Sequence, residues 1–453
     1  MTRPLSHRRR TTAYRGLAVA AITVAGLLPV GAIPASAAAP GLVTAHGHDH
    51  GRDHRHGHGH HRGHHGHGHA RGDDHRGDRG RYTDAGSDAA ADTASDEDCT
   101  QEELSPELAA QLDAAVKQVM NQTGVPGVTV GLWLPGKGRY VRSFGVADKK
   151  TGAPMSDDLY MRIGSVTKTF TATAVLELVD DGLVGLDDPI SRYVSGVPDG
   201  DRITVRNLAE MRSGLFPYSS DPGFVTALES NPTKPFTPEE LLAYGYKHPN
   251  VAAPGTQFQY NNSNYILLGL LVEKVSGVPL AEFIHDRVTK PSGLDDTVFP
   301  AGAEFPSPHA HGYTNQTLNG ATVDAADWNP SWGWAAGAMI SDLEDMKRWA
   351  EDLADGTLLS PETQEQRTKY LSTGLPGAGY GLGIFDVQGW VGHNGSLPGY
   401  ESLVLHMPGT GATLVVLLNT DILHEGIEPS TLFGQAITKI VTPDNVFFIP
   451  ATK

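Results

Sequence analysis

Hydrophobic positions at the beginning of the folding part of the chain repeat with two different periods. Ser105 and Pro106 open a segment whose apolar residues recur on one helical face, which predicts a helix. From Val128 to Leu134 apolar residues recur at every second position, and the turn at 135–138 leads into a second such run. This pattern predicts an antiparallel hairpin directly after the first helix.

The carboxyl-terminal part shows the same two periods in reverse order. Three runs have the composition of strands: 380–386, 389–393 and 402–420. Residues 429–441 then have one apolar helical face. We therefore expect an α/β (α+β) fold, in which one antiparallel sheet is built from both termini and flanked by the terminal helices. Residues from about 181 to 375 are expected to form a large inserted, mostly helical region, in which 222–238 is predicted to be a surface loop.

The first residues of the chain differ from this folding part. Residues 1–37 combine a basic start, an apolar run and the small residues Ala35-Ser36-Ala37, an order typical of a secretory signal peptide. A membrane anchor is the alternative, but Pro29 and Pro34 interrupt the apolar run. We therefore expect a secreted, extracellular protein, and the choice between general and twin-arginine export stays open.

Residues 38–103 form a segment rich in His, Gly, Asp and Arg, which cannot build a core. Runs such as His64-His65-Gly66-His67 allow two interpretations. Imidazoles at this density can bind zinc, nickel or copper weakly, or the segment is a solvated linker whose charge changes near pH ~6.5. The folding part is expected over 104–445, with a short tail at 446–453.

Composition argues against a nucleic-acid partner and excludes an internal disulfide. The formal net charge of −17 over 453 residues argues against a nucleic-acid partner, because phosphate binding needs clustered Lys and Arg. Cys99 is the single cysteine, so no internal disulfide can form and packing alone must hold the core.

Ser165-Val166-Thr167-Lys168 begins an apolar helix and holds the first candidates for chemistry. Residues three apart share a helix face, so the Lys168 amine can lie beside the Ser165 hydroxyl. A serine hydroxyl needs a neighbouring base, and a lysine acts as one when burial lowers its pKa. The alternative is that Ser165 only caps the helix and Lys168 is a solvated residue of the first turn.

Tyr260-Asn261-Asn262 precedes a second apolar helix, predicted from Tyr265 to Val275. A phenol near the nucleophile can carry a proton between serine and leaving group, and the Asn262 amide can orient lysine and substrate. The alternative is an Asn-rich loop that caps the following helix.

His393-Asn394-Gly395-Ser396 lies at the end of a predicted strand. A strand edge beside a serine can bind the backbone of a substrate, and Gly395 permits a close approach. His393 is otherwise a turn histidine or a metal ligand, although no His, Asp or Glu near it has ligand spacing. We therefore predict neither a cofactor nor a metal at these motifs.

The order Ser165-x-x-Lys168, Tyr260-x-Asn262 and His393-x-Gly395 resembles the three motifs of the penicillin-recognising serine hydrolase superfamily. Segments between the motifs, such as Ala336-Gly337 and Tyr380-Gly381-Leu382-Gly383, are similar to the branch of serine-type D-Ala-D-Ala carboxypeptidases and class C β-lactamases. The His-x-Gly form is closer to the carboxypeptidases, since class C β-lactamases carry lysine there. The resemblance implies a β-lactamase/DD-peptidase-like fold.

The resemblance also implies roles for single residues. Ser165 would be acylated, Lys168 and Tyr260 would handle its proton, and His393 would stand where lysine stands elsewhere. The backbone N–H groups of Ser165 and Ser396 would form the oxyanion hole. The substrate-binding positions would be Asn262, Asn394, Gly395, Ser396 and Trp332.

Two departures from the family pattern affect the substrate. Carboxypeptidases of this branch place an arginine shortly after Tyr-Gly-Leu-Gly to grip the substrate's carboxylate, whereas this chain has Ile384-Phe385-Asp386. Asn394 replaces the usual threonine.

Three functions follow, in order of preference. The first is a D-alanyl-D-alanine carboxypeptidase that acts on D-Ala-terminated cell-wall peptides and is acylated by β-lactams. The second is an esterase or D-amino-acid amidase of the same superfamily, which the missing arginine favours. The third is an exported metal-sequestering protein that works through its His-rich segment.

Overall fold

The computed structural model describes residues 102–450. The predicted signal peptide (1–37) and all but the last two residues of the predicted His-rich segment (38–103) lie outside the described residues, as do residues 451–453. In the described part, no helix is long and apolar enough to cross a membrane.

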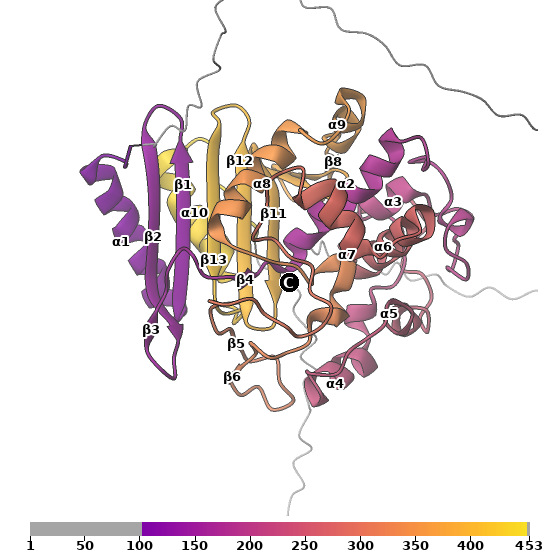
Figure 1. The fold of residues 1–453 in the computed structure, drawn as a ribbon, viewed down its shortest axis with the longest axis horizontal. Helices are drawn as coiled ribbons and strands as arrows, with labels where there is room; N and C mark the ends of the chain where they lie inside the picture. Colours follow the sequence, from indigo (N-terminus) through magenta and orange to yellow (C-terminus); the bar gives the residue numbers. More distant parts are fainter. Residues whose placement is uncertain (1–101, 451–453) are drawn as a thin grey trace, which may run out of the picture. The chain divides into compact units, whose positions relative to one another are not determined.

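A nine-stranded antiparallel sheet forms the centre of the described chain (Figure 1). In spatial order its strands are β3 (Ala153–Pro154), β2 (Gly138–Asp148), β1 (Gly127–Leu134), β13 (Ala412–Leu418), β12 (Tyr400–Met407), β11 (Trp390–Leu397), β10 (Phe385–Val387), β9 (Ala378–Tyr380) and β8 (Leu371–Ser372). β1 pairs with β13 from Val128↔Leu418 to Trp133↔Thr413, so the first strands join the last. The predicted sheet from both termini is confirmed.

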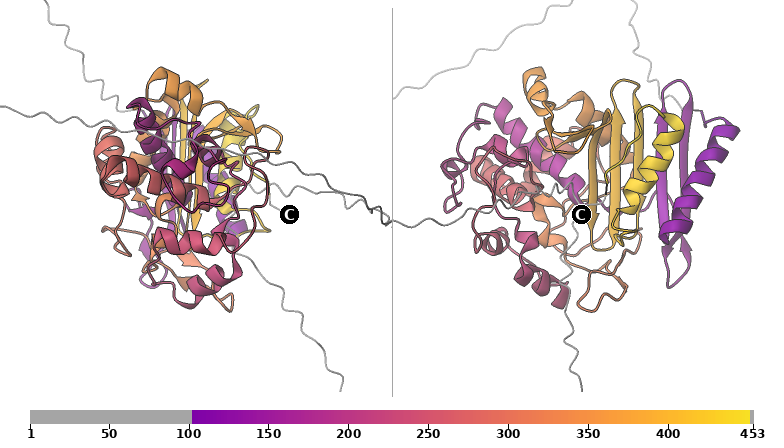
Figure 2. Two further views of the ribbon diagram at one scale, coloured as in Figure 1. Left: turned by 90° about the vertical axis from the view of Figure 1, so that its right-hand side faces the viewer. Right: turned by 180° about the vertical axis from the view of Figure 1, so that it is seen from behind.

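The terminal helices flank this sheet as predicted. Helix α1 (Pro106–Thr123) begins at Ser105, whose hydroxyl accepts a hydrogen bond from the Leu108 N–H. Helix α10 (Pro429–Val441) packs against α1 and against β12 and β13. Both helices lie over one face of the sheet in the rear view of Figure 2.

Between the two ends, the chain forms the inserted region. Its helices are α2 (Thr167–Asp180), α3 (Val205–Ala209), α4 (Pro222–Ser230), α5 (Pro238–Gly245), α6 (Asn262–Ser276), α7 (Leu280–Ile284), α8 (Leu343–Asp355) and α9 (Pro361–Arg367). Its short strand pairs are β4 (Met161–Arg162) with β7 (Ile340–Ser341), and β5 (Tyr313–Thr314) with β6 (Val323–Asp324). Helix α2 packs against α6, and α8 covers the sheet face opposite α10 through β12 and β13.

The predicted surface loop at 222–238 is wrong, because its first half is helix α4. Asp221 caps the helix by accepting from the Phe224 N–H at 2.9 Å, and Pro222 occupies the first turn. Phe224 and Leu228, four residues apart, are both buried. The prolines that suggested a loop mark the start of a helix instead.

A fully buried amide ties the inserted region to the sheet. Asn419, just after β13, accepts from the Gly127 N–H at 2.8 Å. Its amide nitrogen donates to the carbonyls of Val146 and His311, each at 3.0 Å. The end of β2 and the segment that begins at His311 are therefore held to the same point.

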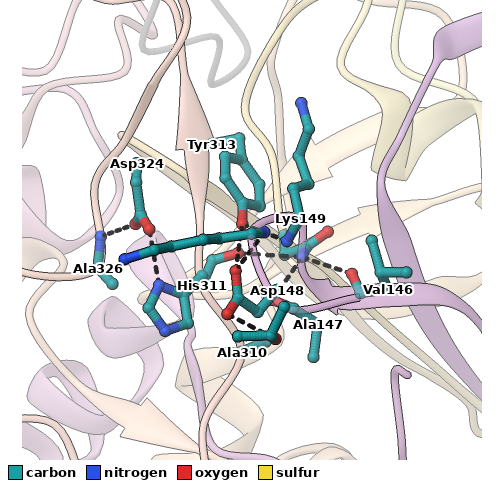
Figure 3. Close-up of polar contacts among 12 residues, drawn as sticks. Val146, Ala147, Asp148, Lys149, Ala310, His311, Tyr313, Asp324 and Ala326 are labelled. Carbon is teal, nitrogen blue, oxygen red and sulfur yellow. Dashed lines mark hydrogen bonds and ion pairs between the residues drawn. The ribbon is translucent and has the colours of Figure 1, made fainter. Parts of the chain in front are cut away.

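Further contacts of this segment lie around that point (Figure 3). The Tyr313 hydroxyl accepts from the Lys149 N–H at 2.7 Å, and His311 contacts the Asp324 carboxylate at 2.7 Å. The Asp324 carboxylate also accepts from the Ala326 N–H at 2.9 Å. These bonds fix the start of the segment that later supplies Trp332 and Ala336 to the site.

After α10 the chain stays packed against the fold. The Phe447 ring is fully buried and lies 6.0 Å from the Phe385 ring, centroid to centroid. The Phe447 N–H donates to the Thr438 hydroxyl at 2.9 Å.

Candidate active site

Ser165 and Lys168 lie side by side where the sheet meets the inserted region. Gly164–Val166 forms a 3-10 turn and α2 begins at Thr167, so Ser165 precedes the α-helix instead of starting it. The Lys168 Nζ lies 2.9 Å from the Ser165 Oγ. The structure therefore brings these two predicted site residues into direct contact.

The Lys168 amine is fully buried and has no counter-ion in the described part of the chain. It donates to the Ala336 carbonyl at 2.7 Å and lies 4.8 Å from the centroid of the Tyr260 ring. Burial lowers the pKa of Lys168 well below its ordinary 10.5. A lysine in this environment is able to accept the proton of Ser165, and the solvated alternative is wrong.

Tyr260 and Asn262 each present one buried atom without a partner. Among residues 102–450, neither the Tyr260 hydroxyl nor the Asn262 Oδ1 has a hydrogen-bond partner of normal geometry. Burial raises the pKa of Tyr260 well above 10, although the nearby Ser165 hydroxyl opposes this rise. The Asn262 amide nitrogen donates to the Ser219 hydroxyl at 3.3 Å. Because an unpaired buried polar atom costs about 1–3 kcal/mol, both atoms are suited to bind polar groups of a substrate.

The capping interpretation of this motif is correct for its middle residue. Asn261 caps α6 by accepting from the Ser263 N–H at 2.9 Å, and its amide nitrogen donates to the Leu215 carbonyl at 2.6 Å. Asn261 therefore fixes the backbone between Tyr260, whose ring lies beside Lys168, and Asn262, which contacts Ser219.

His393 is fully buried and contacts both its own motif and Tyr380 of β9. Its Nδ1 lies 2.5 Å from the Asn394 carbonyl, and its Nε2 lies 3.0 Å from the Tyr380 hydroxyl. Because a carbonyl only accepts, Nδ1 carries the proton and Nε2 accepts from Tyr380. Burial and the charge of Lys168 lower the pKa of His393 to about 3. His393 is therefore neutral, unlike the lysine found at this position in class C β-lactamases.

The third motif lies on a buried strand edge that is open only in the sense that no strand pairs with it over most of its length. β10 pairs with β11 only from Val387↔Trp390 to Phe385↔Gly392. In the described chain, residues 393–397 have a neighbouring strand on the β12 side alone. This is the geometry that the predicted binding of a substrate backbone requires.

Within this stretch, the predicted substrate-binding residues Asn394, Gly395 and Ser396 each contact a different part of the fold. The Asn394 amide donates to the Glu428 carboxyl at 2.7 Å, on the α10 face of the sheet. A Cβ on Gly395 would lie 2.0 Å from the Ile163 carbonyl, so the close approach here is that of the protein's own chain. The Ser396 nitrogen lies against Gly164, next to Ser165.

Trp332 is buried and contacts Tyr218, which directly precedes Ser219, the hydrogen-bond partner of Asn262. Its carbonyl accepts from the Tyr218 hydroxyl at 2.5 Å, and its ring lies 6.2 Å from the Phe224 ring. Tyr218 directly precedes Ser219, so one segment contacts both Trp332 and Asn262.

Three residues that contact the site were not identified from the sequence. Tyr380 and Ala336 both lie in segments that carry the family resemblance, which was the available signal. Ser219, the partner of Asn262, carries no sequence signal. Among residues 102–450, no group of three or more His, Cys, Asp or Glu residues can hold a metal ion.

The chain is similar to known proteins in sequence and in fold. The family model described as Beta-lactamase matches residues 112–429. A D-stereospecific amidohydrolase from Streptomyces sp. is 30% identical with a TM-score of 0.66, over 73% of this chain and 97% of that chain. A D-amino acid amidase from Ochrobactrum anthropi SV3, complexed with D-phenylalanine, is 27% identical with a TM-score of 0.65, over 73% and 99%. An octameric penicillin-binding protein homologue from Pyrococcus abyssi is 28% identical with a TM-score of 0.62, over 73% and 77%.

Curated relatives match at 26–29% identity, and the chain spans 56–70% of their length. The predicted fold, with its sheet from both termini and its inserted helical region, is that of the solved structures. Because the family model covers well over half of the chain, the protein belongs to the Beta-lactamase family and is a class C β-lactamase-like serine hydrolase.

Proposed function

We propose that the protein hydrolyses amides of D-amino acids through an acyl-enzyme formed at Ser165. The observation that carries this proposal is the 2.9 Å contact between the Ser165 hydroxyl and the buried amine of Lys168. The likeness to a D-stereospecific amidohydrolase and to a D-amino acid amidase supports this choice of substrate class.

In the proposed mechanism, neutral Lys168 takes the Ser165 proton while the Ser165 Oγ attacks the substrate carbonyl. The N–H groups of Ser165 and Ser396 stabilise the negative oxygen that develops. The proton then passes through the Tyr260 hydroxyl to the leaving nitrogen as the C–N bond breaks. Water attacks the resulting ester, the same groups move its proton to Ser165, and the free D-amino acid leaves.

The arginines nearest to these elements do not favour a carboxylate-terminated substrate. Arg162 donates to the Ala303 carbonyl at 3.2 Å, and Arg367 donates to the Thr169 carbonyl at 3.2 Å. Both guanidinium groups are buried within the fold. The residues after Tyr-Gly-Leu-Gly are Ile384, Phe385 and Asp386, none of which is a cation that could hold a carboxylate. An amide leaving group needs no such clamp, which supports the amidase over the carboxypeptidase.

A D-alanyl-D-alanine carboxypeptidase, the first choice from sequence, stays the second candidate. The open edge of β11 favours it, because an extended peptide can pair with residues 393–397. The likeness to a penicillin-binding protein homologue is consistent with it. An esterase with the same acyl-enzyme is the remaining alternative.

A product assay separates these candidates. Purified protein is given D-phenylalanine amide, L-phenylalanine amide, a D-Ala-D-Ala-terminated peptide and a nitrophenyl ester, and the released ammonia, D-alanine and nitrophenol are measured. We expect the highest kcat/KM for the D-amide and a preference over the L-amide of at least about tenfold. Greater release of D-alanine from the peptide would favour the carboxypeptidase, and turnover of the ester alone would favour the esterase.

Two serine variants test whether hydrolysis depends on Ser165. Ser165→Ala is expected to lower kcat/KM by about 10³-fold or more, because no acyl-enzyme can form. Ser191→Ala, on an exposed serine, is the matched control and is expected to leave it unchanged. Hydrolysis that survives in Ser165→Ala would exclude the proposed nucleophile. We also propose that a labelled β-lactam acylates Ser165, which intact-protein mass spectrometry of both variants checks.

A further inference from the structure

Two buried carboxyl groups lie behind the third motif. Glu401 in β12 and Glu428, directly before α10, are 1% and 4% exposed. Glu401 is opposite Ser396 in the β11–β12 register, and Glu428 accepts from the Asn394 amide at 2.7 Å. Successive side chains of a strand alternate between faces, so Asn394 and Ser396 share the α10 face while His393 points to the other. The carboxyls thus contact the back of the strand whose front lies at the site.

Each carboxyl has one oxygen with a partner and one without. The Glu428 Oε2 accepts from Asn394, and the Glu401 Oε2 accepts from the Ser430 N–H at 2.8 Å. Among residues 102–450, the Glu401 Oε1, the Glu428 Oε1 and the Ser430 hydroxyl have no hydrogen-bond partner of normal geometry, although the nearby Ser430 hydroxyl lowers the pKa of Glu401. A protonated carboxyl is a donor as well as an acceptor, so a proton held between the two carboxyls would satisfy both free oxygens.

The charges around the pair favour this state. Neither carboxyl has an ion pair with Lys, Arg or His in the described chain. Asp421, in the loop after β13, adds a repelling charge. Burial raises the pKa of Glu428 to about 8, and burial together with the Glu428 charge raises the pKa of Glu401 well above 4.5. At neutral pH the pair therefore retains at least one proton.

We propose that Glu401 and Glu428 share one proton and, in that state, position Asn394 and the open edge of β11 for catalysis at Ser165. The connection to the site runs from Glu428 through the Asn394 amide and, by way of the Asn394 carbonyl, to the Nδ1 of His393. Both glutamates are positioning residues, because each acts through β11. The inference rests on the proposed function only in taking Ser165 as the nucleophile.

Loss of the shared proton would place two like charges in one buried space. The groups that face the pair cannot neutralise them: Asp421 is acidic, and Ser430 on α10 and Tyr260 at the site are uncharged. The carboxyls are then expected to separate, which withdraws Glu428 from Asn394. Catalysis should therefore fall on the alkaline side as the proton leaves.

The pH dependence of kcat/KM, measured with a nitrophenyl ester between pH 5 and 10, tests the proposal. Wild type is expected to lose activity at alkaline pH. Glu401→Gln and Glu428→Gln keep both hydrogen-bonding atoms but cannot form a doubly charged pair. We expect each to retain activity at pH 6.5 within about threefold and to move the alkaline limb upward by about one pH unit or more. Glu428→Ala should lower kcat about tenfold or more at every pH, because Asn394 loses its partner.

Glu239→Gln, on an exposed glutamate of α5, is the matched control and should follow wild type. A wild-type profile without an alkaline limb, or a limb that stays in place in both glutamine variants, overturns the proposal. So does a Glu428→Ala variant that is folded and fully active.

A second measurement needs no substrate. Because the folded pair binds a proton that the unfolded chain releases above pH ~4.5, its contribution to stability is present at low pH and is lost as pH rises toward 8. The urea midpoint should fall less steeply between pH 5 and 9 in either glutamine variant than in wild type. Equal slopes would contradict the shared proton. This comparison holds even if Ser165→Ala stays active, so the inference and the proposed function can fail separately.

Discussion

Lys168 is a basic residue placed where a charge is poorly tolerated. Its amine has the Ser165 hydroxyl and the Ala336 carbonyl as polar neighbours and two aromatic rings, those of Tyr260 and Tyr265, nearby. Removal from water favours the neutral form, and only the neutral form can accept a proton. The burial that makes Lys168 a base therefore also lowers the stability of the fold at neutral pH.

The pH dependence of a lysine variant tests both consequences. We expect kcat/KM of wild type to rise with pH through the lowered pKa of Lys168. Lys168→Met should lower it by about 10²–10⁴-fold at every pH, because the base is absent. The unfolded chain binds a proton at Lys168 that the folded chain does not, so this residue destabilises the fold below pH ~10.5 and ceases to do so above it. Lys168→Met should therefore unfold at the same or a higher urea concentration at pH 7.

Lys117→Met, on an exposed lysine of α1, is the matched control and should change neither activity nor the urea midpoint. A Lys168→Met variant that retained activity would show that another group accepts the proton. Loss of several kcal/mol of stability at pH 7 would show that the amine is charged and paired in the native state.

At the scale of residues, the sequence predicts contacts that follow from local spacing. The three-residue interval of Ser165 and Lys168 places them together on any helical turn. The Glu401–Glu428 pair has no such signal, because 26 positions separate two glutamates that only the packing of α10 on β12 brings close. Buried acids in general escape prediction for this reason, since a glutamate is usually an exposed residue.

At the scale of elements, the site depends on how closely β11 approaches the turn that holds Ser165. The Ser402 hydroxyl donates to the Ile163 carbonyl at 2.8 Å, which fixes the strand pair to this turn. Gly164 and Gly395 face one another across the approach. A side chain at either position would separate the Ser165 and Ser396 N–H groups that the proposed oxyanion hole needs.

Gly395→Ala tests this approach. Its Cβ would lie 2.0 Å from the Ile163 carbonyl, so the strand or the turn must move. We expect a loss of about 1–3 kcal/mol in the free energy of unfolding and at least about a tenfold loss of kcat. Gly409→Ala is the matched control, since nothing lies within 4 Å of the Cβ it would add. If Gly395→Ala kept full kcat and stability, neither would depend on the close approach of β11 to the turn that holds Ser165.

Elements were predictable where periodicity and caps agree. Helix α10 has the predicted bounds, because Pro429 starts it and its apolar face is continuous. Helix α4 was missed because Pro222 was taken as loop punctuation, although a proline after Asp221 is also a helix start. A proline can thus belong to a loop or to the first turn of a helix. Here the burial of Phe224 and Leu228, four residues apart, indicates the helix.

At the scale of the whole molecule, one sheet joins chain segments that are almost 300 positions apart. The Gly127 and Asn419 contact shows how both ends and the inserted region converge on one buried amide. Matching strand patterns at the two ends were enough to predict that they share a sheet. The position of the inserted region was beyond prediction, because it depends on bonds such as that between Asn419 and His311.

The His-rich segment is expected to act independently of the hydrolase. All the groups used in the proposed mechanism lie within residues 102–450, where no cluster of three or more potential ligands can hold a metal. We therefore propose that any binding of zinc or nickel belongs to the histidines of residues 47–75. Deleting residues 47–75 should abolish metal binding in calorimetric titrations and leave kcat/KM within about twofold.

Two results would contradict this independence. Metal binding that persists after the deletion would place the ligands elsewhere, and the segment would then be a solvated linker. A large loss of hydrolysis would mean that the segment supports the folded part directly. A chelator added to the full-length protein distinguishes the second case from metal-assisted chemistry. The proposed hydrolysis moves its protons through Lys168 and Tyr260, so removing divalent metal should leave the rate unchanged.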